Sequence, residues 1–463
     1  EGLGALAFVL LFPLCSALPD RGFGLSKIVG LALFSWMSWF LASVGFLKVS
    51  ALLGLLVLGF LLILAVLSAR IPQDSLRQFL ASKWPRLAAL EILFLVFWGI
   101  FLVIRAYHPG AIGGEKPMNM AFINAVYRAE TFPPEDPWAL GHPINYYYYG
   151  HAILALAGRF IGLPAEYLFN IGGTTISGLT ALAVFSLAWL LCRRTFIAFL
   201  ATYLACFAGH FLSYLNLIRY ELNETGGSIR SVISSIVPTL QLMAGCLRHY
   251  LGLSTPEIEQ RLRDLRYDTF WESSRVIPHT VANEFPYWTH LFLDFHAHML
   301  VMPFTFAFVI LLYNYFARPR EEKPGAVLGL SFFMGLLFGT AICANTWDLP
   351  ALAIAFLLIT AVKFYRESGW FGGAPVRPRI LCPESLQAVF RFPLAPVALV
   401  FLFGIGLFLP FYSNFISRVS SVGIMTEGST AVRTYLGFWI HLLTPLMITA
   451  ILLAVLRQDG RVS

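Results

Sequence analysis

The chain has 463 residues, of which 58% are hydrophobic, 15% aromatic and only 12% charged. Soluble globular domains carry about twice that share of charge, so the composition excludes a water-soluble fold and indicates a protein whose solvent is the bilayer. The net charge of +7 does not indicate a nucleic-acid partner, because the basic residues gather in the connections between apolar segments, as they do in multi-pass membrane proteins.

The apolar segments run for about 20 residues without alternation, which predicts transmembrane helices rather than barrel strands. Hydropathy windows place the predicted spans near residues 2–18, 27–47, 50–69, 87–106, 167–191, 195–215, 289–316, 325–344, 350–366, 393–412 and 435–457. We therefore predict an all-α polytopic membrane protein with about 11 transmembrane helices. Residues 1–463 form a single transmembrane domain, which we expect to be part of a longer chain because it opens in an apolar run at Glu1.

Lysine and arginine in short connections predict the orientation of the spans. The connection 70–86 carries four basic residues and is assigned to the cytoplasm. The membrane that we expect the protein to span is the plasma or inner membrane. Alternation from that connection places the other short basic connections inside as well. The ten histidines then all fall on the extracytoplasmic side, which predicts that a polar, active face lies there.

The segment 146–163 is a further apolar candidate, but counting it as a span would turn every later basic connection outward. We predict instead an amphipathic helix at the outer membrane surface, within a first large outer loop over 107–163. A second, longer outer loop is predicted over 216–288.

The first motif that can carry chemistry is Gly113-Gly-Glu-Lys-Pro-Met-Asn119, directly after the fourth predicted span. Glu115 can act as a base toward an acceptor hydroxyl, and Lys116 can hold a phosphate. An ordinary charged loop at the membrane interface explains the same residues.

The second motif is Pro133-Pro-Glu-Asp-Pro-Trp138, followed by Gly141-His-Pro-Ile-Asn-Tyr-Tyr-Tyr-Tyr-Gly-His151. The prolines predict a stiff segment that presents the Asp136 carboxylate as a second candidate acid. The candidate substrate-binding residues here are Asn145, Tyr146, Tyr147, Tyr148 and His151. An aromatic belt at the headgroups is the alternative.

The third motif begins at Glu284 and ends in Asp294-Phe-His-Ala-His298. In an unbroken helix Asp294 and His298 share one face, whereas His296 points about 200° away. A break near Phe295 would bring all three together as ligands for a divalent metal. Glu284, His296 and His298 also suit hydrogen bonds to a sugar or phosphate. Histidines satisfied by neighbouring helices are the structural alternative.

The fourth motif is Asn345-Thr-Trp-Asp348, at the start of a predicted span. Asp348 can cap that helix, and Trp347 offers a stacking surface for a sugar ring, with Asn345 beside it. Arg433, before the last predicted span, is a candidate phosphate ligand.

These motifs, in this order across about 105–440, resemble the YYY-domain membrane proteins, a family without an assigned reaction. The resemblance implies an Asp where Asn119 stands and a Pro where Ala297 stands, so position 119 is not expected to supply a catalytic acid here. The layout is similar to that of the glycosyltransferase-C superfamily, whose members have an acidic residue in the first outer loop.

The resemblance implies a glycosyltransferase that uses a polyprenyl-phosphate-linked sugar on the extracytoplasmic face. Glu115 or Asp136 would be the catalytic carboxylate, which deprotonates or orients the acceptor. Membrane lipids and the sugar donor are the expected partners, and no nucleic acid is expected. Two other classes remain open. One is a non-catalytic integral membrane subunit that scaffolds protein partners, and the other is a transporter or flippase.

Overall fold

The computed structural model describes residues 1–68, 73–107, 109–207, 286–318, 323–367, 395–416 and 432. The chain divides into two compact units, the first formed by Glu1–Tyr203 with Asp294–Ser417 and the second by Leu204–Leu293 with Arg418–Ser463. Most of the second unit lies outside the described residues, and so do Glu284, Arg433 and the predicted span 435–457. The packing and the site described below belong to the first unit.

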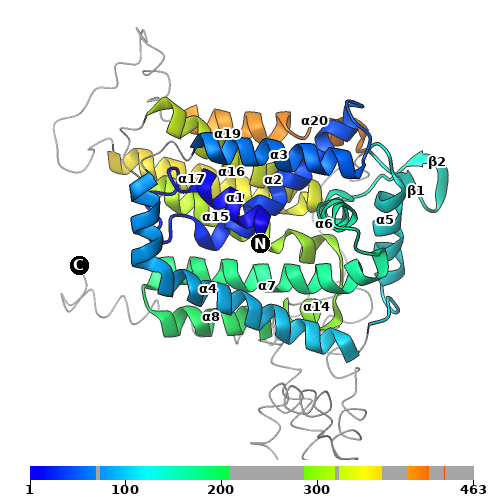
Figure 1. Cartoon of the computed structure of the whole chain (residues 1–463), viewed down its shortest axis with the longest axis horizontal. Coiled ribbons are helices and arrows are strands. Elements are labelled where there is room, and N and C mark those ends of the chain that lie inside the picture. Colours follow the sequence, from blue (N-terminus) through cyan, green and yellow to red (C-terminus); the bar gives the residue numbers. More distant parts are fainter. Residues whose placement is uncertain are drawn as a thin grey trace, which may run out of the picture. The chain divides into compact units, whose positions relative to one another are not determined.

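Helices make up nearly all of the described chain (Figure 1). They are α1 Gly2–Leu11, α2 Phe23–Ser43, α3 Ala51–Ser68, α4 Gln73–Tyr107, α5 Lys116–Arg128, α6 Tyr149–Phe160, α7 Ala165–Cys192, α8 Thr195–Phe207, α14 Pro286–Phe292, α15 Ala297–Ala317, α16 Pro324–Ala344, η1 Thr346–Asp348, α17 Leu349–Glu367, α19 Ala395–Gly406 and α20 Leu409–Asn414. The strands β1 Glu135–Asp136 and β2 Ala139–Pro143 form an antiparallel hairpin in which Glu135 lies opposite Pro143.

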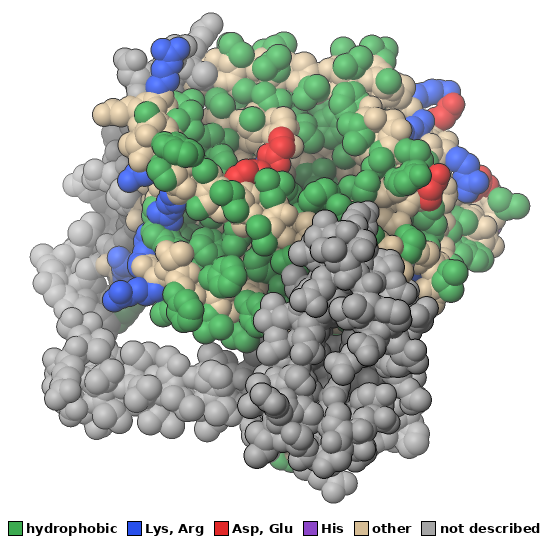
Figure 2. All heavy atoms as spheres, turned by 60° about the horizontal axis from the view of Figure 1, so that its bottom comes forward, with side chains coloured by type: hydrophobic (Ala, Val, Ile, Leu, Met, Phe, Trp, Pro, Cys, Tyr) green, Lys and Arg blue, Asp and Glu red, His purple; other side chains and the backbone are tan. Residues whose placement is uncertain are grey.

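Among the described residues, seven helices are long and apolar enough to cross a membrane, and three shorter apolar helices accompany them. The long ones confirm predicted spans in α2, α3, α4, α7, α15, α16 and α17, and the short ones fall on three further predicted spans. Hydrophobic side chains cover most of the coloured face in Figure 2, and lysine and arginine side chains gather at its edges. The total of eleven spans stays a prediction.

Several predicted boundaries differ from the observed helices. The first predicted span extended to residue 18, but α1 ends at Leu11 and turns follow. Much of the predicted cytoplasmic connection 70–86 is helix, because α4 begins at Gln73 and continues through Pro85. Polar residues at the start of a long helix lower the hydropathy average, so the window reported only its apolar part.

Glycines allow α16 and α19 to approach closely. A Cβ at Gly335 would lie 2.4 Å from the Phe403 Cβ, and one at Gly339 would lie 2.3 Å from the Phe408 ring. The spacing of these two glycines is the small-xxx-small pattern of membrane helix pairs, in which helices associate by close packing because lipid supplies no hydrophobic drive.

Helix α6 is enclosed by protein. It packs against α2, α5, α7 and α16, and its residues from Tyr149 to Leu156 are all buried. Its 12 residues are too few to cross a bilayer, as expected. We had expected an amphipathic helix with one face open over 146–163, whereas protein covers α6 on several sides. Arg159 is accommodated because its guanidinium donates to Ala129 O (2.5 Å) and Val126 O (3.3 Å), the last carbonyls of α5.

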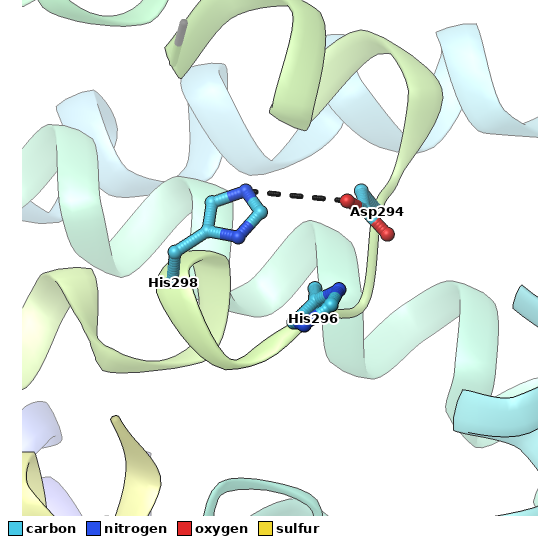
Figure 3. A group of neighbouring side chains, drawn as sticks. All are labelled: Asp294, His296 and His298. Atoms are coloured by element: carbon cyan, nitrogen blue, oxygen red, sulfur yellow. Dashed lines mark ion pairs between the residues drawn. The ribbon is translucent and has the colours of Figure 1, made fainter. Parts of the chain in front are cut away.

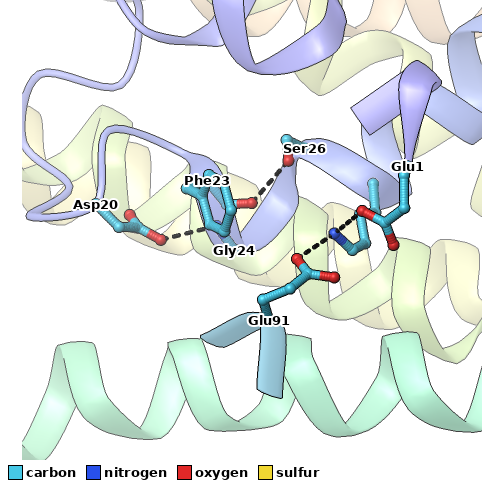
Figure 4. Close-up of polar contacts among 7 residues, drawn as sticks. Glu1, Asp20, Phe23, Gly24, Ser26 and Glu91 are labelled. Atoms are coloured by element: carbon cyan, nitrogen blue, oxygen red, sulfur yellow. Dashed lines mark hydrogen bonds and ion pairs between the residues drawn. The ribbon is translucent and has the colours of Figure 1, made fainter. Parts of the chain in front are cut away.

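The turn before α2 and the contact of α2 with α4 are held by acidic side chains (Figure 4). Asp20 accepts hydrogen bonds from the backbone N–H groups of Gly22 (3.2 Å) and Gly24 (2.9 Å) at the start of α2. The Lys27 ammonium lies 2.5 Å from the Glu91 carboxylate of α4, with only 11% of the lysine side chain exposed. Both contacts satisfy polar groups that would otherwise be costly to bury.

Basic residues gather where α7, α15 and α17 end. Arg193 donates to the Tyr313 hydroxyl at 3.3 Å, and the Lys363 ammonium lies 2.5 Å from the carbonyl of Arg318. The starts of α15 and α17 carry the acidic and histidine motifs instead. A helix of the length of α15 separates the two ends by about 30 Å, which is the thickness of a bilayer core.

We predict that Gly339→Ala destabilises the protein by about 1–3 kcal/mol, because the new methyl group would overlap the Phe408 ring and the Gly404 carbonyl. Thermal unfolding in detergent measures the effect. Gly59→Ala in α3 is the matched control, since nothing lies within 4 Å of its added Cβ. Equal midpoints for the two variants would contradict this packing.

Candidate functional site

The centre of the site is the non-helical segment Asp294–His296, which leads into α15. Helix α14 ends at Phe292 and α15 begins at Ala297, and Leu293 between them has a φ of 52°. A left-handed Leu costs free energy and is characteristic of functional segments. The predicted span 289–316 is therefore interrupted, and the interruption includes Phe295, where a break was the condition for bringing His296 to Asp294 and His298.

The break brings Asp294, His296 and His298 together. Each offers one ligand atom, and the three atoms lie within 4.8 Å of one another. Figure 3 shows Asp294 on the connecting segment with His298 facing its carboxylate, at a separation of 4.0 Å. Asp294 is nearly buried, whereas 35% of the His298 side chain is exposed, so the cluster can be reached from one side.

His296 connects this cluster to two other motifs. Its Nδ1 lies 2.7 Å from the Glu115 carboxylate, and its Nε2 lies 2.6 Å from the Tyr146 hydroxyl. A neutral imidazole with its proton on Nδ1 satisfies both contacts, since it donates to Glu115 and accepts from Tyr146. Glu115, His296 and Tyr146 therefore form one hydrogen-bonded chain, although they are far apart in the sequence.

The Glu115 side chain is 54% exposed and Tyr146 is more buried. Burial raises the pKa of the Tyr146 phenol, and the negative charge of Glu115 adds to that effect. Tyr146 therefore stays protonated and remains the donor to His296.

Two buried cations lie beside the cluster. Lys116 is the first residue of α5, after Gly113 and Gly114, which both have positive φ. Burial and, to a smaller extent, the charge of Arg105 lower the pKa of the Lys116 ammonium to about 8, and Asp294 opposes the shift. Arg105, in the last turn of α4, is held by hydrogen bonds to Asn170 Oδ1 (2.5 Å) and Gly110 O (2.7 Å).

Asp348 belongs to the same end of the molecule. Its carboxylate accepts hydrogen bonds from Thr305 Oγ1 of α15 (2.7 Å) and Asn345 Nδ2 (3.0 Å), and it interacts electrostatically with His298. Asp348 therefore links η1 to α15, and Asn345 holds the Asp348 carboxylate. Trp347 is 62% exposed, so its ring is available for stacking.

The other predicted binding residues in the tyrosine motif have structural partners. Asn145 bonds both backbone groups of Ile416, and the Tyr147 ring packs on Phe415. Tyr148 is 3% exposed and accepts a hydrogen bond from Trp39 Nε1, so its burial excludes direct contact with a substrate.

His151 is also excluded from substrate contact by burial. It is 0% exposed, its Nε2 lies 2.9 Å from Asn119 Oδ1, and its ring meets Phe122 and Phe295. Burial is the main reason that the pKa of His151 is lowered to about 3. His151 is therefore a neutral support beneath the break, and Asn119 is its hydrogen-bond partner.

Asp136 lies in the hairpin rather than in the histidine cluster. Its carboxylate accepts a hydrogen bond from the backbone N–H of Trp138 at 2.8 Å, which is a local turn contact. Trp138 packs edge-on against Phe122 of α5. The contacts of the described chain thus bring Glu115 to the histidines and give Asp136 a role in the turn.

Sequence reasoning missed Arg105. It was counted as the polar end of an apolar span, and nothing in its local pattern separates it from an interfacial anchor. The available signal was a Lys eleven residues later in the first outer motif, since two cations close in the sequence suit an anion-binding site.

A family model described as an uncharacterized membrane protein (DUF2298) matches residues 33–462. No curated protein and no solved structure matches the chain.

We predict that the protein loses stability as the pH falls below about 6.5, and that His151→Gln reduces this loss. The folded protein keeps His151 neutral, whereas the unfolded chain protonates it, so the unfolded state binds the extra proton between pH 6.5 and about 3. At pH 5 this difference costs about 2 kcal/mol. Thermal midpoints at pH 7.5 and 5 measure it. His142→Gln, on the exposed strand β2, is the control and should retain the wild-type pH dependence.

Proposed function

The chain belongs to the DUF2298 family of uncharacterized membrane proteins, and we propose that it is a glycosyltransferase that takes its sugar from a polyprenyl phosphate on the extracytoplasmic face of the membrane. One observation carries the proposal. The hydrogen-bonded chain of Glu115, His296 and Tyr146 lies beside the buried cations Lys116 and Arg105, so a base and a phosphate site adjoin.

In the proposed reaction an acceptor hydroxyl attacks the anomeric carbon of the donor sugar. The new carbon–oxygen bond forms as the bond from that carbon to the phosphate oxygen breaks, and the electron pair leaves on the phosphate. Glu115 takes the acceptor proton, because its carboxylate is half-exposed and His296 holds its orientation.

Lys116 and Arg105 bind the phosphate in this proposal and stabilise the charge that develops on the leaving oxygen. Arg105 presents a planar guanidinium fixed by two hydrogen bonds, and Lys116 contributes a point charge. The exposed Trp347 ring is available to stack on the sugar. Tyr146 does not react itself. Its hydroxyl donates to His296 Nε2 and so keeps the imidazole proton on Nδ1.

The extracytoplasmic orientation is supported by the separation of charges along the helices. Arg193, Arg318 and Lys363 lie at the ends of α7, α15 and α17, whereas Asp348 and the histidines lie at the starts of α15 and α17. Basic residues concentrate on the cytoplasmic side of membrane proteins, so the acidic end is assigned to the outside.

We predict that Glu115→Gln lowers transfer by about 10²–10⁴-fold, the range of general base catalysis. The test incubates purified protein in lipid nanodiscs with a panel of polyprenyl-phosphate hexoses and measures the release of polyprenyl phosphate. Glu130→Gln is the matched control, because Glu130 is an exposed carboxylate that pairs with the exposed Lys48.

Asp136→Asn distinguishes the two candidate carboxylates, Glu115 and Asp136. This variant should release polyprenyl phosphate at a rate within a few-fold of the wild type. Unchanged release by Glu115→Gln, or loss in Asp136→Asn alone, would contradict the role given to Glu115. A scaffold subunit would be favoured if the wild type releases no polyprenyl phosphate from any donor and all variants still assemble with their protein partners. Movement of donor between leaflets without release would favour a flippase.

A further inference from the structure

We propose that Asp294, His296 and His298 bind one divalent transition-metal ion. The three ligand atoms lie within 4.8 Å of one another, and they comprise two imidazole nitrogens and one carboxylate oxygen. This donor set suits zinc, manganese or iron, whereas magnesium and calcium prefer oxygen ligands alone. Three protein ligands leave coordination positions open for an exogenous group.

The distances require only a small closure. Bonds of about 2.0–2.2 Å to a central ion place neighbouring ligand atoms about 3.0–3.5 Å apart. The Asp294 carboxylate and the His298 Nε2 are 4.0 Å apart, so they approach by about 0.5–1.0 Å when the ion binds. All three ligand atoms lie within 4.8 Å, so no pair has to approach by more than about 1.8 Å. Side-chain rotation supplies this movement, because the backbone positions are fixed by the start of α15.

Glu115 prepares His296 for coordination. Its carboxylate accepts a hydrogen bond from the Nδ1–H group of His296 at 2.7 Å. The lone pair of the imidazole is then on Nε2. A carboxylate on the far nitrogen is the usual support of a metal-bound histidine, because it fixes the tautomer and raises the basicity of the ligand. The Tyr146 hydroxyl now occupies Nε2 at 2.6 Å, so the ion replaces that hydrogen bond.

The surrounding charges favour a cation. Asp294, Glu115 and Asp348 supply three carboxylates around His296 and His298, and Lys116 with Arg105 supplies two positive charges that act against them. A bound divalent ion makes this group net positive. Its open positions would then take phosphate oxygens, and only this last clause rests on the proposed transfer reaction.

The test measures binding by the purified full-length protein, prepared with an affinity tag that contains no histidine and stripped with EDTA. Zinc is added alone, and bound zinc per chain is measured by mass spectrometry after gel filtration. The wild type is expected to retain about one ion more than Asp294→Asn and His298→Gln do. Glu115→Gln should weaken affinity by about 10–100-fold, as loss of a supporting carboxylate does.

His142→Ala is the matched control, since it removes an exposed histidine on the hairpin and should retain the ion. Tyr146→Phe removes the competing hydroxyl and should bind at least as tightly as the wild type. Cobalt-loaded Asp294→His, in which an imidazole replaces the carboxylate, should keep the visible absorption of bound cobalt at a shifted position. A misfolded variant would lose that absorption instead.

Equal zinc content in the wild type, Asp294→Asn and His298→Gln would overturn the metal site. So would loss of the ion in His142→Ala. These outcomes are independent of the transfer assay, because a protein that binds zinc but releases no polyprenyl phosphate contradicts only the proposed function.

Discussion

An apolar chain in a bilayer has to satisfy its backbone hydrogen bonds within itself, and this constraint arranges the described part of the molecule. Helices satisfy it over long stretches, and glycines such as Gly335 and Gly339 let those helices touch. An interruption is tolerated only where protein covers the freed groups. The break before Ala297 meets that condition, because the neutral His151 and the Phe169 ring pack under Phe295.

Much of the fold could be predicted from hydropathy alone, since runs of about 20 apolar residues leave few alternatives to a spanning helix. Boundaries were harder. Polar residues such as those at the start of α4 belong to a helix but not to its apolar window. The setting of α6 was not predictable, because its burial depends on helices from distant parts of the chain, and the amphipathic pattern of 146–163 describes only its own residues.

The site was predicted in part, and for a definable reason. Local spacing placed Asp294 and His298 on one face and required a break for His296, which the structure contains. Pairings between motifs, such as Tyr146 with His296, cannot be read from spacing, because each motif offers several donors and acceptors. Burial then divided the tyrosine motif, leaving Tyr146 at the cluster and Tyr148 in the core.

The two roles of Glu115 constrain each other through His296. Without an ion, Glu115 accepts the Nδ1 proton and Tyr146 donates to Nε2, so the carboxylate is oriented but retains its second oxygen. An ion on Nε2 would make the Nδ1–H a stronger donor, and a carboxylate that accepts a stronger hydrogen bond is a weaker base. The acceptor proton would then pass to Glu115 only from a hydroxyl held at an open coordination position, because a divalent cation lowers the pKa of a hydroxyl that it binds. Coupling of this kind would keep Glu115 from acting as a base toward a hydroxyl that the ion does not hold.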